Sequence, residues 1–272
     1  ETIPKADVQS FKDAGGFNND WVVTDAVALY VLSCRSGLDL DLDGFTEEIE
    51  TAGGGVEGAK SVIRDRFDTE RASRVLEQWD PDRLRTVFQQ LYLGPDAYRE
   101  MEDATPDLYV GSGAEDQAAD TDLELPPEGY MANEPVLIDP GTIEELAADF
   151  ELGVVTGRPR AEAKLALSRV GLSIPSERLF AMGEWAGKPD PAALITVAER
   201  AAGTAIVFAG DTRDDIRTAT NADAADPNRT YDGIGVLTGG LCGQEGTRAF
   251  EAVGASAVIE TVNELPDRLY PR

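Results

Sequence analysis

The pattern of hydrophobic and polar positions changes once along this chain. Residues 1–94 read as amphipathic helices separated by breaks that contain glycine, at 15–16, 36–37 and 53–55. Within this stretch, residues 82–92 carry apolar side chains at the spacing of one helix face, as a helix packed on a core requires. The first part of the chain is therefore predicted to be helical.

From residue 136 onward, short apolar runs of strand length alternate with helical patterns. Strands are expected at 152–155, 179–182, 205–209, 234–237 and 257–259. Helices are expected between them, at 160–170, 191–202 and 214–221. Such alternation is typical of a parallel sheet with crossover helices.

The predicted fold class is therefore α/β, with a doubly wound, Rossmann-like parallel-sheet core over residues 131–272. A helical cap region is expected over residues 1–130. Within it, residues 111–127 are rich in Asp, Glu, Gly and Pro and are expected to form an exposed, mobile acidic loop.

Composition narrows the possible partners. The net charge is −27, yet 42% of the 272 residues are hydrophobic and the acidic residues are spread through every segment. This indicates a folded protein with an acidic surface rather than a disordered acidic chain. Nucleic acid and anionic membranes are not expected as partners, because their phosphates require basic patches. Scarce lysine with abundant aspartate and alanine is typical of halophilic proteins, whose self-repulsion is screened by salt.

The lack of histidine, the isolated cysteines and the lack of a long apolar run limit the possible chemistry and indicate the cellular compartment. Histidine is absent, which excludes Ser-His-Asp triads, Cys-His dyads and histidine-ligated zinc sites. Cys34 and Cys242 are isolated and are expected to be free thiols, as in a reducing cytoplasm. No apolar run approaches the length of about 20 residues that spans a membrane, and no signal peptide is visible. A cytoplasmic location is expected.

The segment 206–215 carries the clearest chemistry. An apolar strand ends at Gly210, Asp211 follows at the strand tip, and Asp215 lies in the first turn of the next helix. Open parallel sheets build ligand sites at the carboxyl ends of their strands. Two carboxylates there can supply oxygen ligands to Mg2+, although an aspartate after a strand also commonly caps a helix.

Two further segments place phosphate-binding groups in the same half of the chain. Thr156, Gly157 and Arg158 follow an expected strand, where a hydroxyl and backbone N–H groups suit a phosphate oxygen. Lys188 enters a predicted helix through Gly-Lys-Pro, and it is one of only five lysines in the chain. Each segment alone fits an ordinary turn, whereas the ordered set favours a site. The residues 236–240 are expected to open into a glycine turn beside it.

This ordered set resembles the haloacid dehalogenase-like superfamily of phosphohydrolases, in a capped, phosphoglycolate-phosphatase-like branch of haloarchaeal type. The resemblance covers the chain well from about residue 134 and more loosely before it. It implies that Thr156 and Lys188 hold the phosphoryl group, with Gly157 and Arg158 beside Thr156. It also implies Mg2+ bound by Asp211 and Asp215, with Asp214 nearby.

The family's first motif, which carries the nucleophilic aspartate and an acid/base aspartate, has one candidate here, Asp41 and Asp43. A central strand buried on both faces should be continuously apolar, but polar residues precede Asp41 and Asp39 would share its face. The alternative is a surface cap on a helix over 45–51. Because the chain begins at Glu1 within a polar segment, we expect the nucleophile to lie upstream and residues 1–272 to be inactive alone.

The function implied is Mg2+-dependent hydrolysis of a small phosphorylated metabolite through an aspartyl phosphate. A phosphosugar mutase, a 2-haloacid dehalogenase and a degenerate phosphate-binding member remain alternatives from other classes. Substrate and oligomeric state are not encoded in any recognisable motif. If a central strand is absent, strands 152–155 and 205–209 should each expose an unpaired edge.

Overall fold

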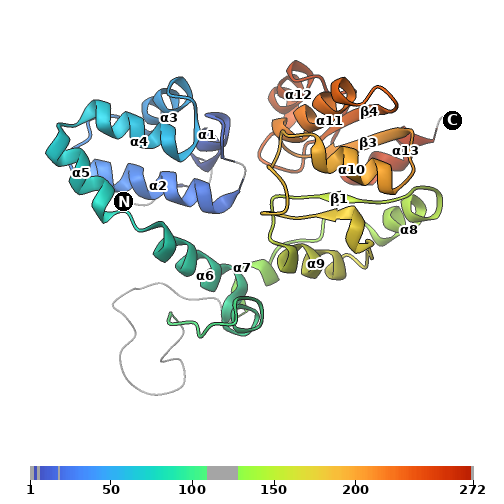
Figure 1. Ribbon diagram of the computed structural model, residues 1–272, viewed down its shortest axis with the longest axis horizontal. Coiled ribbons are helices and arrows are strands. Elements are labelled where there is room, and N and C mark those ends of the chain that lie inside the picture. The colour runs from blue at the N-terminus through green and yellow to red at the C-terminus, as the bar shows by residue number, and fades with distance from the viewer. Residues whose placement is uncertain (1–2, 5–6, 18, 109–127, 271–272) are drawn as a thin grey trace. The chain divides into compact units, whose positions relative to one another are not determined.

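The computed structural model describes residues 3–4, 7–17, 19–108 and 128–270. The predicted acidic loop at 111–127 lies outside these residues. The chain forms two compact units, Glu1–Pro135 and Val136–Arg272. The boundary lies five residues after the predicted one, which was between residues 130 and 131. Figure 1 shows helices alone in the first unit and both helices and strands in the second.

Helices with polar caps build the first unit. Asn19, Asp41, Asp68 and Asp80 each stand in extended backbone and accept a backbone N–H of the first helical turn, which is why four helices begin there. The helices are α1 (Val8–Asp13), α2 (Asp20–Arg35), α3 (Leu42–Thr51), α4 (Gly55–Arg66), α5 (Thr69–Gln78), α6 (Pro81–Glu102) and α7 (Gly129–Ala132).

The core of this unit is apolar and aromatic. Phe11, Leu29, Phe45, Ile49 and Ile63 are fully buried, and the rings of Phe11 and Phe45 meet edge to face with centroids 6.5 Å apart. The predicted helical stretch 82–92 lies within α6, which runs further than expected and bends at residue 94, a glycine with a φ of 75°. The helical character predicted for this half is confirmed.

The second unit is an α/β core. Its strands are β1 (Val154–Val155), β2 (Leu179–Phe180), β3 (Ala205–Gly210), β4 (Thr230–Val236) and β5 (Ala257–Ile259). Its helices are α8 (Pro140–Asp149), α9 (Arg160–Arg169), α10 (Ala192–Arg200), α11 (Arg213–Ala225), α12 (Gly243–Ala252) and α13 (Leu265–Leu269), with 3-10 turns at Ser176–Arg178 and Val262–Glu264. The α/β class predicted from the alternation is confirmed.

All strand pairs in the unit are parallel. Strand β1 pairs with β2, and β3, β4 and β5 form a separate sheet in that order. Gly210 at the end of β3 pairs with Gly235, so that β3 and β4 end at the same edge. Parallel strands cannot be joined by a hairpin, which explains the crossover helices between them.

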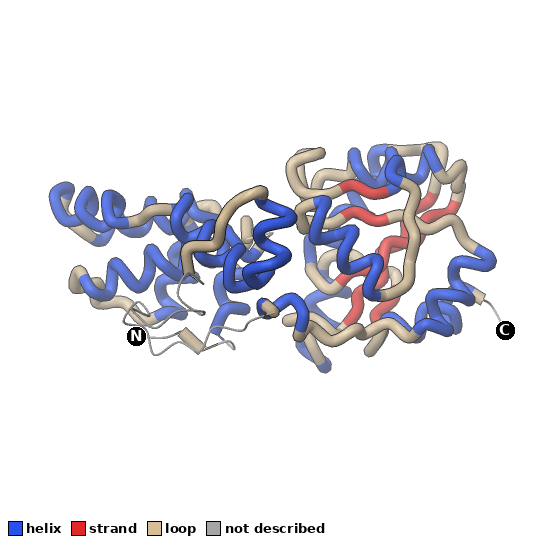
Figure 2. Tube along the Cα trace, turned by 90° about the horizontal axis from the view of Figure 1, so that it is seen from below, coloured by secondary structure: helices blue, strands red, loops and turns tan. Residues whose placement is uncertain are grey.

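Helices cover both faces of the larger sheet. In Figure 2, the red strands of this unit lie between blue helices. On one face, Phe208 and Tyr231 pack in a cluster with residues of α10 and α11, and Phe250 of α12 lies against Gly235. On the other face, Ile234 and Val236 pack in a cluster with Leu146 of α8 and Leu265 of α13. This two-sided cover is the doubly wound arrangement.

Among the described residues, β1 pairs with β2 alone and β3 pairs with β4 alone, so one edge of each strand is without a partner strand. The outcome matches the expectation for these two strands. Val207, in the middle of β3, remains 38% exposed, although a valine in a central parallel strand is normally covered on both faces. The second unit is therefore two sheets joined by helices.

Candidate functional site

The candidate residues of the second unit stand in loops and helix starts that follow strands. Thr156 follows β1, and Asp211 follows β3. Lys188 lies in the loop between β2 and α10, and Asp214 and Asp215 lie in the first turn of α11. Strands β1 and β3 thus each have a polar candidate directly after their carboxyl ends, where parallel sheets form ligand sites.

A buried ion pair is the centre of this region. The Lys188 Nζ lies 2.6 Å from Asp215 Oδ1, and the two side chains are only 16% and 4% exposed. The pair joins residues 27 positions apart in the sequence and links the β2–α10 loop to α11. A buried charge is costly without a partner, so each group here makes the burial of the other tolerable.

The second oxygen of Asp215 closes a capping box at the start of α11. Asp215 Oδ2 accepts hydrogen bonds from Thr212 N (2.9 Å) and Thr212 Oγ1 (2.7 Å). In return, Thr212 Oγ1 accepts from Asp215 N at 3.2 Å. Both carboxylate oxygens of Asp215 are therefore already engaged by protein groups.

Gly210 is required for this arrangement because the side chain of Asp215 folds back over it. A Cβ at position 210 would lie 2.3 Å from Asp215 Cγ, far inside van der Waals contact. The glycine that ends the apolar run in the sequence is thus explained by close approach rather than by turn geometry.

Asp211 is exposed at the end of β3, next to the turn after β4. A Cβ at Gly239 would lie 2.4 Å from Asp211 Oδ2, so the glycine turn at 238–240 runs directly past this carboxylate. The glycine turn that the sequence placed beside the candidate site thus lies next to Asp211.

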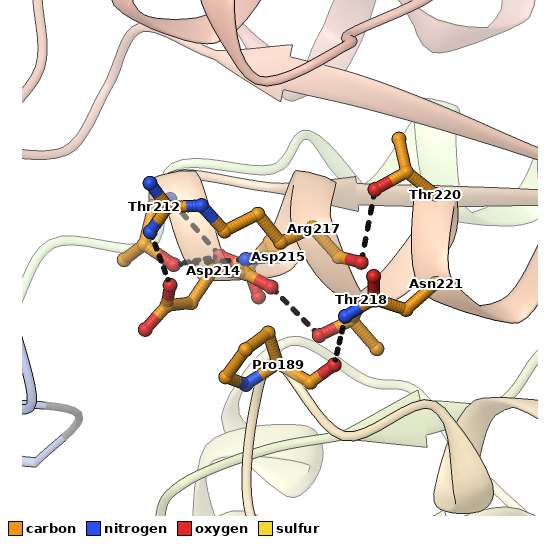
Figure 3. Close-up of polar contacts among 8 residues, drawn as sticks. All are labelled: Pro189, Thr212, Asp214, Asp215, Arg217, Thr218, Thr220 and Asn221. Atoms are coloured by element: carbon orange, nitrogen blue, oxygen red, sulfur yellow. Dashed lines mark hydrogen bonds and ion pairs between the residues drawn. The ribbon is translucent and has the colours of Figure 1, made fainter.

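Asp214 faces along the surface of α11. Its Oδ1 lies 3.0 Å from Arg217 Nη1, and its carbonyl accepts a hydrogen bond from Thr218 Oγ1 at 2.7 Å (Figure 3). The carboxylate is held by an ion pair one turn further along the same helix.

Thr156 closes the turn that follows β1. Its hydroxyl accepts a hydrogen bond from Arg158 N at 3.1 Å, and the carbonyl of Arg158 accepts from Met182 N at 2.9 Å. Gly157 lies between them, within the same turn.

The segment before Lys188 is fixed by an arginine. Arg160 Nη2 donates to Glu184 Oε2 at 2.6 Å and to the carbonyl of Leu179 at 2.6 Å, and Ala181 N donates to Glu184 Oε2 at 3.1 Å. The Arg160 guanidinium lowers the pKa of Glu184 to about 2, so this carboxylate stays ionised. The loop that leads to Lys188 is therefore tied to α9 and to the end of β2.

Asp41 and Asp43 lie elsewhere, in the helical unit. Asp41 is the N-cap of α3 and accepts a hydrogen bond from Gly44 N at 2.9 Å, and Asp43 lies in the first turn of that helix. No strand precedes them among the described residues of this unit. The geometry is that of the surface cap that the polar residues around Asp41 predicted.

The donor set at the end of β3 fits Mg2+ in its chemistry. Carboxylate oxygens are the ligands that this ion prefers, and Mg2+ commonly uses one or two of them and keeps several waters. Among the described residues, no group of three or more His, Cys, Asp or Glu side chains is assembled for a metal. Asp211, Asp214 and Asp215 are the residues that would hold the ion, and the last two also contact Arg217 and the pair Lys188 and Thr212, respectively.

Two contacts of this region were not predicted. The first is the role of Thr212, which the spacing Thr-x-x-Asp at 212–215 could have revealed, because it is the spacing of a capping box. The second is the hydrogen bond from Asn221 Nδ2 to the carbonyl of Pro189, for which the sequence holds no signal.

Two further expectations concern the cysteines, expected to be free thiols, and the helices, expected not to span a membrane. Cys34 and Cys242 are both free, as expected. Within the described ranges, none of the helices combines the length and the apolar character needed to cross a bilayer.

Comparison with known proteins gives two likenesses of fold. No family model and no curated protein matches the chain. Among solved structures, a hydrolase from Pseudomonas syringae is 16% identical with a TM-score of 0.44, covering 92% of each chain. A protein described as a haloacid dehalogenase-like hydrolase from Bacteroides fragilis is 16% identical with a TM-score of 0.43, covering 90% of this chain and 93% of its own.

Proposed function

We propose that this protein is a Mg2+-dependent phosphomonoester hydrolase that acts on a small phosphorylated metabolite. The observation that carries the proposal is the buried Lys188–Asp215 pair at the start of α11, four residues after the Asp211 carboxylate. A cation for phosphoryl oxygens, from the β2–α10 loop, is thus held at the start of the helix that follows the Asp211 carboxylate, which could hold a hard metal ion. Phosphoryl transfer depends mainly on positioning and on such charge stabilisation.

Each residue has a stated part in this proposal. The hydroxyl of Thr156 and the backbone of Gly157 and Arg158 would contact phosphoryl oxygens at the end of β1. Lys188 would offset the negative charge that develops on those oxygens, with its orientation fixed by Asp215. Mg2+, when bound through Asp211, would neutralise the transferring group. The helical unit would act as the cap.

The reaction implied by the resemblance begins with attack of a carboxylate on phosphorus, with protonation of the departing alcohol. Water then hydrolyses the aspartyl phosphate and returns the carboxylate. Asp41 caps α3 in the helical unit, and Asp43 lies in the first turn of that helix. The residues of the second unit are therefore proposed to bind and polarise the phosphoryl group.

A phosphatase assay tests the proposal. Release of p-nitrophenol from p-nitrophenyl phosphate by the full-length natural protein would be measured in 2 M KCl with Mg2+ or with a chelator. Asp211→Asn should abolish turnover, and Lys188→Ala should reduce it by about 2–4 kcal/mol of transition-state stabilisation. Glu251→Gln, an exposed carboxylate change on α12, is the matched control. Turnover that survives the chelator, or full activity of Asp211→Asn, would refute the proposal.

A second candidate is a member of the same fold that binds phosphorylated ligands without turnover. The position of Asp41 in a helix cap favours it. Equilibrium binding of inorganic phosphate separates the two candidates. Binding that depends on Lys188 without hydrolysis would support the binding protein. Hydrolysis that Asp41→Asn abolishes would instead assign the nucleophile to Asp41.

A further inference from the structure

Helix α11 contacts the Lys188 loop at two points. At the first, Asp215 Oδ1 lies 2.6 Å from Lys188 Nζ. At the second, Asn221 Nδ2 donates a hydrogen bond of 2.9 Å to the carbonyl of Pro189, the residue after Lys188 (Figure 3). The tip of the lysine and the backbone beside it are thus both held from one helix.

The hydrogen bond from Asn221 to Pro189 holds the backbone beside Lys188, which the ion pair at Nζ alone does not hold. A lysine side chain has a flexible four-carbon stem, so an ion pair at Nζ alone leaves its Cα free to shift. Pro189 has no N–H, so its peptide nitrogen cannot anchor the loop by donating a hydrogen bond. The carbonyl of Pro189 remains, and Asn221 binds it. The chain on the far side closes with Asp190 N donating to the carbonyl of Gly187 at 2.9 Å.

We propose that Asn221 is a positioning residue for Lys188. It fixes the backbone at the base of the lysine, while Asp215 fixes the ammonium at its tip, so that the charge is held at the start of α11. The effect of Asn221 on catalysis rests on the proposed phosphohydrolase function, whereas its effect on the position of Lys188 does not. Asn221 contacts the loop through its amide and is not a catalytic residue.

Chemical labelling tests the positioning without any activity assay. Lys188 and the exposed Lys164 would be acetylated in trace with acetic anhydride and compared by mass spectrometry. Asn221→Asp keeps the shape of the side chain but places an acceptor against the Pro189 carbonyl. Labelling of Lys188 relative to Lys164 should rise about fivefold, the equivalent of about 1 kcal/mol for one hydrogen bond.

The matched control is Thr220→Ala. Thr220 is the neighbouring residue on α11, and its Oγ1 donates only within the helix, to the carbonyl of Arg217 at 3.0 Å. Its loss should leave the labelling ratio of Lys188 unchanged. Asn221→Ala, which removes the donor without repulsion, should raise the ratio as Asn221→Asp does. An unchanged ratio in both Asn221 variants would overturn the inference.

A double-mutant cycle separates positioning from general stabilisation. The dissociation constant of inorganic phosphate would be measured for Asn221→Ala in the natural chain and in a Lys188→Met background. The constant should rise about fivefold in the first case and not at all in the second, because Asn221 acts through Lys188. An equal rise in both would overturn the positioning role. Failure of the natural chain to bind phosphate would overturn the proposed function, and the labelling ratio would still decide the inference.

Discussion

Asp215 divides its two carboxylate oxygens between two partners. Oδ1 holds the Lys188 ammonium, and Oδ2 holds the backbone and the hydroxyl of Thr212. The same residue therefore begins α11 and holds the ammonium of Lys188. The stability of the second unit should therefore fall when either Lys188 or Thr212 is lost as a partner of Asp215.

Replacing Lys188 with Met should destabilise the fold strongly. The methionine leaves the Asp215 charge buried with no counter-ion, and breaking such a pair typically costs about 3–5 kcal/mol of unfolding free energy. Denaturant unfolding in 2 M KCl measures the loss. Lys164→Met, at an exposed position of α9, is the control and should change stability little. Adding Asp215→Asn to Lys188→Met should restore part of the loss, and equal losses at 164 and 188 would contradict this reading.

Replacing Gly210 with Ala should also destabilise the second unit. The new methyl group would stand 2.3 Å from Asp215 Cγ and would displace that side chain from its partners. Overpacking of this kind costs about 1–3 kcal/mol. Gly203→Ala is the matched control, because the nearest atom to its Cβ is Ile206 Cδ1 at 3.9 Å. Unfolding by urea compares the two, and similar midpoints would show that Asp215 relaxes without cost.

At the scale of elements, the sequence predicted where each strand of the second unit lies but not always how long it is. The expected helix at 160–170 is α9, Arg160–Arg169, almost to the residue. The expected strand at 152–155 is reduced to Val154–Val155, which pairs on one side only. An apolar run shows that a segment is buried, but the length of a strand also depends on its neighbour in space. That neighbour is not encoded in the run itself.

The turn between α11 and β4 should make stability depend on acid. Asp226 is buried there and accepts hydrogen bonds from Arg229 Nη1 (2.7 Å), Asn228 N (3.0 Å) and the Tyr231 hydroxyl (2.9 Å). Its interaction with Arg229, more than the others, lowers the pKa of Asp226 from 3.8 to about 2. The stabilisation from this residue is therefore complete above about pH 4.

That stabilisation should disappear as the pH falls from about 4 through about 2, because the unfolded chain binds the proton first. Asp226→Asn should be less stable at neutral pH and should lose less free energy of unfolding over this range. Tyr231→Phe, which removes one of the three donors, should lie between the two. Unfolding midpoints at pH 2 to 5 in constant KCl provide the comparison. Parallel curves for the natural and Asp226→Asn chains would exclude this role.

At the scale of the whole molecule, the net charge of −27 dominates. At 0.01 M salt the Debye length is about 30 Å, so repulsion acts across the molecule, whereas at 1 M it is about 3 Å. The folded state should therefore gain stability steeply with KCl. Thermal unfolding from 0.1 to 3 M KCl tests this, and a flat or falling midpoint would refute the halophilic interpretation.

The candidate site could be predicted only in part, because some of its contacts join residues that are far apart in the sequence. The sequence located Thr156 and Asp211 after strands and Lys188 at a helix entry, because such turns are local patterns. It did not show that Lys188 pairs with Asp215 or that Asn221 binds Pro189. These contacts join residues 27 and 32 positions apart, through the packing of α10 and α11. Local spacing carries no information on such distances.

The break between the two sheets has a consequence for cooperativity. Among the described residues, no strand pairing joins β1–β2 to β3–β5, so helix packing and the Lys188–Asp215 contact must transmit stability across the break. The two halves of the second unit should then open separately, at different free energies, as independent cooperative segments do. A phosphate held by Thr156 and Lys188 on one side, and through a metal ion on Asp211 on the other, would bridge that break. Ligand binding would then merge two unfolding steps into one.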